Sequence, residues 1–222
     1  PLSQALGAAR MSGELSGMWD ASLLSPNWAS SSAAATIVRF FGAVAIVVGL
    51  KRESKVITSF GVAAVVASFA LTGHTRTHTP QELLAILLII HLSMIVFWFG
   101  ALPALVTVAK RESSVLVIEK FSKHATILVP CLAIAGLAMA LFLLPNIAAL
   151  ATPYGIALVV KVNSFLVLML LAALNKLRFV PAMQRGDRSA FVAFARTATV
   201  EYAIIVIVLC VTATMTTLFS PD

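Results

Sequence analysis

The chain has 222 residues, of which 60 % are hydrophobic and only 11 % are charged, and its mean hydropathy is +0.99. Soluble domains are about 45–50 % apolar and about 25 % charged, so this composition excludes a soluble enzyme, a disordered chain and a disulfide-rich secreted module. It predicts a protein that crosses the bilayer several times. The net charge of +7 is then a topology signal, and no nucleic-acid partner is expected.

Six stretches are apolar enough to form membrane-spanning helices, because a bilayer core of about 30 Å needs roughly 20 helical residues. None shows the alternation of a barrel strand, so we predict an all-α, polytopic transmembrane helical bundle of about six membrane-spanning helices. The first stretch is short and contains Arg39, and Pro103 is expected to kink or end the third. The predicted spans are Ala33–Leu50, Val56–Thr72, Leu83–Val108, Ala125–Leu144, Gly155–Leu177 and Val200–Phe219.

Basic residues gather after alternate spans. Twelve of the sixteen lysines and arginines follow the first, third and fifth spans, which the positive-inside rule places in the cytoplasm. Residues 1–32 and the C-terminus are then outside. Since the chain starts without a signal peptide, we expect one or more further helices upstream. The twelve residues are Lys51, Arg52, Lys55, Lys110, Arg111, Lys120, Lys123, Lys176, Arg178, Arg185, Arg188 and Arg196.

Polar and sulfur-bearing side chains form one layer in the outer half of the predicted bundle. At about 1.5 Å per helical residue, Arg39 and Lys161 lie about 9 Å inside their spans, and His91 lies about 12 Å inside the third. Met94 shares the helix face of His91, and Asn163 follows Lys161 closely. Ionisable residues in a bilayer are costly. The layer therefore predicts a solvent-connected vestibule that opens outward, or a cofactor pocket.

The histidines are the best candidate metal ligands. His74 and His78 lie in the outer loop between the second and third spans, above His91. Imidazole suits copper, zinc, nickel and haem iron, and thioether sulfur selects Cu(I). We predict a metal site of His74, His78, His91 and Met94 that takes copper at the loop and passes it inward. Solvation is the simpler interpretation of His78, and packing is the simpler interpretation of Met94.

Arg39 and Lys161 complicate a copper site, because two cations repel a metal ion in a low dielectric. Glu14, Asp20 and Glu82 are candidate partners that would neutralise them. Alternatively, the two cations hold an anion such as the propionates of haem. The protein would then be a haem-binding or redox membrane protein with His91 as an axial ligand.

Trp98 lies deep in the third span, on roughly the same helix face as His91. Its indole N–H needs a hydrogen-bond partner there, so we expect Trp98 to line the interior of the bundle. Gly100, two residues further on, is expected to permit close approach of a neighbouring helix.

Three blocks between residues 13 and 181 carry a recognisable pattern. The first is GELSGMWDASLLSPNWASSSAAATIVRF, and the second is LTGH followed by HLSMIVFWFGALPAL. The third and most specific is TPYGIALVVK followed by LAALNKLRFVP. Together they resemble the CopD/PcoD family of inner-membrane copper resistance (copper transport) proteins, although Ala101 replaces a common glycine and His78 lies outside the pattern. The family pattern falls here on Arg39, His74, His91, Trp98 and Lys161.

The resemblance implies a bacterial inner-membrane protein that is not an enzyme and that contributes to copper resistance and homeostasis. It implies inward movement of copper, as Cu(I) or Cu(II), from a periplasmic CopC-like copper-binding protein. It also implies a periplasmic N-terminal segment at 1–32 and a CopD-like transmembrane helical domain at 33–222, in contact with membrane lipid. Full-length members have more helices before the first block, so the chain is expected to be N-terminally truncated. No phosphate-binding loop GxxxxGK[ST] is present, which predicts passive or ion-coupled transport.

Overall fold

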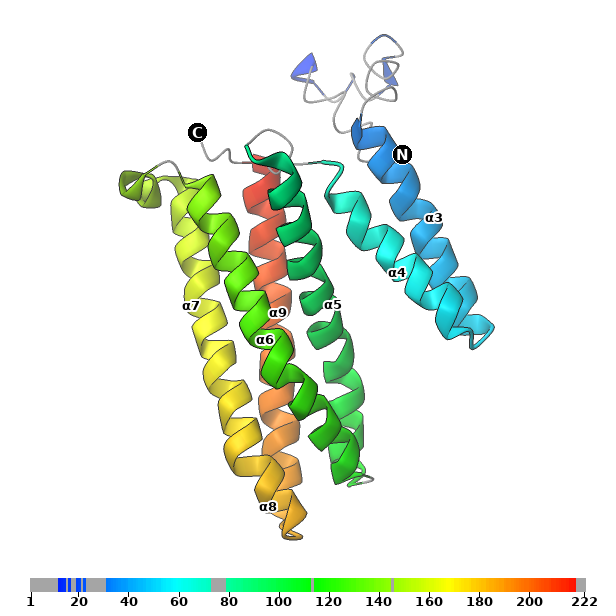
Figure 1. The fold of residues 1–222 in the computed structure, drawn as a ribbon, viewed down its shortest axis with the longest axis vertical. Helices are drawn as coiled ribbons and strands as arrows, with labels where there is room; N and C mark the ends of the chain where they lie inside the picture. Colours follow the sequence, from blue (N-terminus) through cyan, green and yellow to red (C-terminus); the bar gives the residue numbers. More distant parts are fainter. Residues whose placement is uncertain are drawn as a thin grey trace. The chain divides into compact units, whose positions relative to one another are not determined.

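The computed structural model describes residues 12–14, 16, 19–20, 22, 31–72, 79–112, 114–144 and 146–218. These residues are largely helical and include no β-strand (Figure 1). The predicted all-α class is therefore confirmed. In chain order the elements are α3 (Ser31–Lys51), α4 (Lys55–Phe69), α5 (Gln81–Lys110), α6 (Val115–Leu143), the 3-10 helix η3 (Ile147–Ala151), α7 (Pro153–Leu174), the π-helical turn η4 (Asn175–Phe179), α8 (Val180–Gln184) and α9 (Arg188–Leu218).

Five of the described helices are long and apolar enough to cross a membrane. The second predicted span, Val56–Thr72, forms α4, which has only 15 residues and is shorter than a bilayer core needs. Large apolar side chains lie on the outer surfaces: Phe60, Leu141 and Leu170 are each more than 70 % exposed. Such surfaces suit lipid rather than water. The five spans are Ser32–Lys51, Gln81–Lys110, Val115–Leu143, Pro153–Gln184 and Arg188–Ala213.

Two helices begin well before their predicted starts. α6 begins at Val115 rather than Ala125, and α9 begins at Arg188 rather than Val200. Hydropathy detects only the apolar part of a helix. The helix itself continues through charged residues, whose long side chains reach the water beyond the bilayer core. The predicted starts were therefore wrong, although the predicted helices exist.

The chain divides into two compact units, Pro1–Ser93 and Met94–Asp222. In the first unit α3 and α4 form an antiparallel pair joined by a short turn (Figure 1). Gly42 and Gly49 on α3 and Gly61 on α4 lie at the contact between the two helices. A Cβ atom on Gly61 would lie 2.6 Å from the carbonyl oxygen of Gly42, so only glycine allows this approach of the two backbones.

The second unit is a bundle in which α5 from Met94 onward, α6, α7 and α9 run side by side (Figure 1). Pro103 does not end α5, which continues for seven more residues. The α5–α6 and α8–α9 turns lie at the same end of the unit, where Arg188 Nε is 3.4 Å from Glu112 Oε2. A Cβ atom on Gly100 would have nothing within 4 Å, so the predicted close approach at Gly100 is wrong.

α7 passes without a break through the π-helical turn η4 into α8. Asn175, the first residue of that turn, is 7 % exposed, and Met183 in α8 is 2 % exposed. Asn175 and Met183, eight positions apart, therefore both face the interior of the second unit across this turn.

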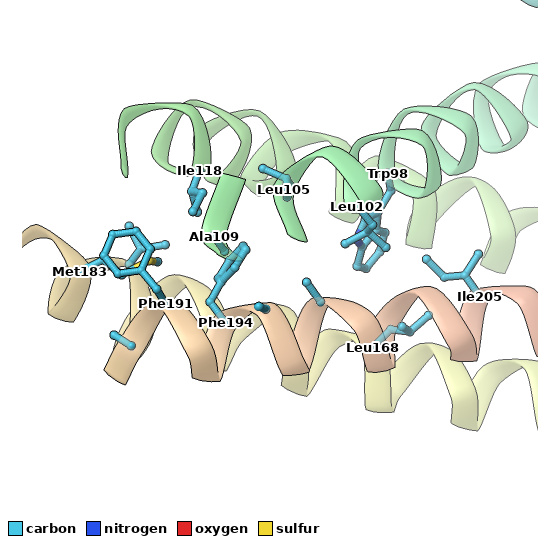
Figure 2. Packing of buried hydrophobic residues seen from close by; sticks show 14 of the residues in the cluster. Trp98, Leu102, Leu105, Ala109, Ile118, Leu168, Met183, Phe191, Phe194 and Ile205 are labelled. Atoms are coloured by element: carbon cyan, nitrogen blue, oxygen red, sulfur yellow. The ribbon is translucent and has the colours of Figure 1, made fainter. Parts of the chain in front are cut away.

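Apolar side chains from all the helices of the second unit fill its interior (Figure 2). Ile118 and Ala198 are fully buried, and Leu102 is 2 % exposed. Because lipid is as apolar as these side chains, close packing rather than exclusion of water stabilises such a bundle. The cluster comprises Trp98, Leu102, Leu105, Ala109, Ile118, Leu132, Leu168, Val180, Met183, Ala190, Phe191, Phe194, Ala195, Ala198 and Ile205.

Candidate functional site

Two of the four predicted copper ligands lie on α5. His91 is ten residues after the start of the helix, about 15 Å along its axis, and is half-buried. Met94 is also half-buried and packs against the apolar core of the second unit. The spacing of three residues on a continuous helix places both side chains on the same face.

The other two predicted ligands, His74 and His78, fall outside the described residues. Among the residues that the structure does describe, no three His, Cys, Asp or Glu side chains are grouped as a metal site. The complete four-residue copper site therefore stays a prediction.

Arg39 is held by the helix pair of the first unit. Its Nε donates to Ser68 Oγ at 2.9 Å, and a terminal nitrogen donates to Thr72 Oγ1 at 3.1 Å and to the Ser68 carbonyl at 3.4 Å. The guanidinium also lies over the ring of Phe69, 4.2 Å from its centroid, in a cation–π contact. The Ser68 hydroxyl, the Ser68 carbonyl and the Thr72 hydroxyl thus accept the hydrogen bonds of Arg39, which explains how an apolar helix accommodates this cation.

The acidic residues proposed to balance Arg39 have other contacts. Glu14 and Asp20 are both exposed, and their carboxylates accept hydrogen bonds from Ser16 Oγ at 3.0 Å and Ser22 Oγ at 2.6 Å. Each acid is therefore held within its own short segment.

Lys161 and Asn163 lie on α7 in the second unit. Lys161 is half-buried, and among the described residues no acidic side chain pairs with it. Asn163 is exposed, and its Nδ2 donates at 2.9 Å to the carbonyl of Val159 on the same helix.

A carboxyl group that the sequence reasoning did not single out lies inside the second unit. Glu201 on α9 is 2 % exposed. Trp98 Nε1 donates to its Oε2 at 3.2 Å, and Asn175 Nδ2 donates to its Oε1 at 2.6 Å. The Thr197 hydroxyl donates to the Asn175 carbonyl oxygen. Three elements, α5, η4 and α9, thus supply one buried polar network, in which the indole of Trp98 finds the partner that its depth requires.

The signal for Glu201 was present in the sequence. Glu201 is the second residue of the predicted span Val200–Phe219, where an acid is ordinary for a helix end. Because α9 begins at Arg188, Glu201 lies about 20 Å along the helix, well inside it. The error in the helix start therefore concealed the buried acid.

These features define a class of protein: a multi-pass helical membrane protein with an ionisable side chain, Glu201, buried in its second unit. Residues 115–215 match the model of the CopD family, described as copper resistance protein D. This part of the chain, slightly less than half of its length, is therefore similar to the CopD family of copper resistance proteins. The match includes the third sequence block and most of α9, whereas the first two blocks precede it. No curated protein and no solved structure matches the chain.

Proposed function

We propose that this protein, which is similar to the CopD family over residues 115–215, transports copper across the bacterial inner membrane, inward from the periplasm. Copper is the substrate. The observation that carries the proposal is the position of His91 on the membrane-crossing helix α5, with Met94 one turn further on the same face. A half-buried imidazole in an apolar helix is costly, and a metal ligand is one role that offsets the cost.

In this proposal copper enters at His74 and His78 and passes to His91, with Met94 as a soft neighbour that favours Cu(I). Arg39 and Lys161 set the electrostatic field of the entrance. A periplasmic CopC-like copper-binding protein is the donor, and it meets the outward-facing side that includes residues 1–32.

The proposed orientation rests on the basic turns. The turns after α5 and after α8 lie at one end of the second unit, joined by the Arg188–Glu112 ion pair. Both turns are rich in lysine and arginine, and such loops stay in the cytoplasm. The periplasmic entrance then lies at the opposite end of the helices.

Haem is the weaker alternative. It requires Arg39 to clasp a propionate, but the guanidinium already has Ser68, Thr72 and the Phe69 ring as partners. A propionate would have to displace these contacts. The copper-resistance family also favours copper over iron.

The experiment is elemental analysis for copper and iron on the detergent-purified chain, supplied with either metal. The wild type is compared with His91→Ala and with a matched control, His124→Ala, whose exposed ring binds the Lys120 carbonyl on its own helix. We expect copper in the wild type and the control, and its loss in His91→Ala. Equal copper in all three proteins would overturn the role of His91. Iron in place of copper, in a protein that is purified visibly red, would establish the haem alternative.

A further inference from the structure

The carboxyl group of Glu201 has two neutral donors and no cationic partner among the described residues. Burial in a membrane-crossing helix opposes its ionised form, whereas the Trp98 and Asn175 hydrogen bonds favour that form. Because burial and the hydrogen bonds act in opposite directions, the carboxyl group is suited to both the protonated and the ionised form.

A cavity of about 230 Å³ lies beside this carboxyl group. Trp98, Asn175 and Glu201 line one part of it, and Ser122, Thr126 and Lys176 line another. Lys176 is exposed and donates to Thr126 Oγ1 at 2.6 Å. Most of its lining is apolar, but the volume is sufficient for several water molecules at about 30 Å³ each.

Few charged groups face Glu201 from the elements packed around it. Of the charged side chains of the described helices, Lys176 of η4 is the one that shares the cavity with Glu201; α5 and α6 contribute none to its lining. His124 of α6 is exposed and bound to the Lys120 carbonyl. Tyr202, next to Glu201 on α9, stacks on Phe99 with ring centroids 4.6 Å apart. Titration of a neighbouring group therefore contributes little to a pH-dependent change at Glu201.

We propose that Glu201 is a proton-binding site that exchanges its proton with water through this cavity. A hydronium ion in the cavity transfers its proton to Oε2, and a neutral water molecule remains. Oε2 is the favoured oxygen because its hydrogen bond from Trp98, at 3.2 Å, is longer than the 2.6 Å bond that Asn175 donates to Oε1. A bound proton on Oε2 opposes the indole N–H, so protonation weakens that hydrogen bond.

Trp98 is consequently a built-in reporter of the protonation of Glu201. The chain has three tryptophans, and Trp19 is 83 % exposed at a distance in sequence from the network. Replacing Trp19 and Trp28 by phenylalanine leaves Trp98 as the single tryptophan of the full chain, and excitation beyond the absorption of Tyr154 and Tyr202 selects it. Its emission in detergent is then measured as a function of pH, without copper, so the result is independent of the proposed transport function.

With Glu201 present we expect one single-proton transition in Trp98 emission. Glu201→Gln should abolish it, and Glu201→Asp should retain it with a shifted midpoint. The matched control is Glu119→Gln, which removes an acid whose partners are Lys123 and Gln184; its transition should be unchanged. A flat titration with Glu201 present, or the same transition in Glu201→Gln, would overturn the proposal. If Glu201→Gln fails to fold, an unshifted midpoint in Glu201→Asp would overturn it equally.

The route is tested by stopped-flow pH jumps on the same Trp98 reporter. Ala125 is half-buried and lines the cavity, so Ala125→Leu should narrow the path without touching the network. We expect a slower fluorescence response with the same final amplitude. An unchanged rate would show that protons reach Glu201 by another path.

Discussion

The same glycine-to-alanine substitution should have different effects at Gly61, which lies at the contact between α3 and α4, and at Gly100 on α5. In Gly61→Ala the added methyl would lie 2.6 Å from the Gly42 carbonyl oxygen and 2.8 Å from the backbone nitrogen of Ile46. Ordinary contact begins at 3.4 Å, so the two backbones must separate by about 0.8 Å. In Gly100→Ala the methyl meets nothing within 4 Å and requires no movement.

The magnitude follows from these distances. A radial gap of 0.5–1 Å already loses about a quarter to a half of the dispersion attraction between facing atoms, and overpacking of this kind costs about 1–3 kcal/mol. The helix propensity of alanine over glycine returns up to ~1 kcal/mol at either position. Gly61→Ala should therefore be destabilised, whereas Gly100→Ala should be neutral or slightly stabilised.

The assay is thermal unfolding of the full chain in one detergent, followed by helical circular dichroism at a fixed scan rate. For a chain of this size 1 kcal/mol corresponds to roughly 2–4 °C in Tm. We expect a lower Tm for Gly61→Ala and an unchanged or higher Tm for Gly100→Ala. Equal shifts in the two variants would refute the reasoning that backbone contact at Gly61, rather than helix propensity, decides the effect.

Two further predictions use the same assay. Ile118→Ala removes a fully buried side chain and should cost about 2–5 kcal/mol, whereas Leu116→Ala, at a side chain 57 % exposed, should cost much less; similar losses would contradict the assigned core. Arg39→Ala removes the hydrogen bonds to Ser68 and Thr72 and should lower stability by about 1–3 kcal/mol. A wild-type melting curve for Arg39→Ala would show that these contacts do not hold α3 against α4.

The membrane fold was largely predictable because apolar composition and helix length are properties of local sequence. The helix ends were not, since hydropathy ceases to be informative where side chains reach water. The long N-terminal extension of α9 from Arg188 is an example. That single error moved Glu201 from the interior of a helix to its apparent edge.

Contacts between distant residues were predicted less well than positions along the helices. The sequence indicated that Arg39 and Trp98 need partners, because each is polar and surrounded by apolar residues. It did not identify Ser68 or Glu201 as those partners, 29 and 103 positions away respectively. Partner identity depends on how helices pack, and the same limit explains why Gly61, rather than Gly100, marks a close helix contact.

The π-helical turn η4 has a consequence for the alignment of the helix faces around it. A residue added to an α-helix rotates everything that follows by about 100°, and a π-turn absorbs such an insertion locally. The turn therefore acts as a phase correction between α7 and α8. Removing one residue from Asn175–Phe179 would restore regular α-helical phase, and Met183, now 2 % exposed, would be rotated away from the core. The length of this turn, as much as its chemistry, determines which side chains of the α7–α8 segment face the interior.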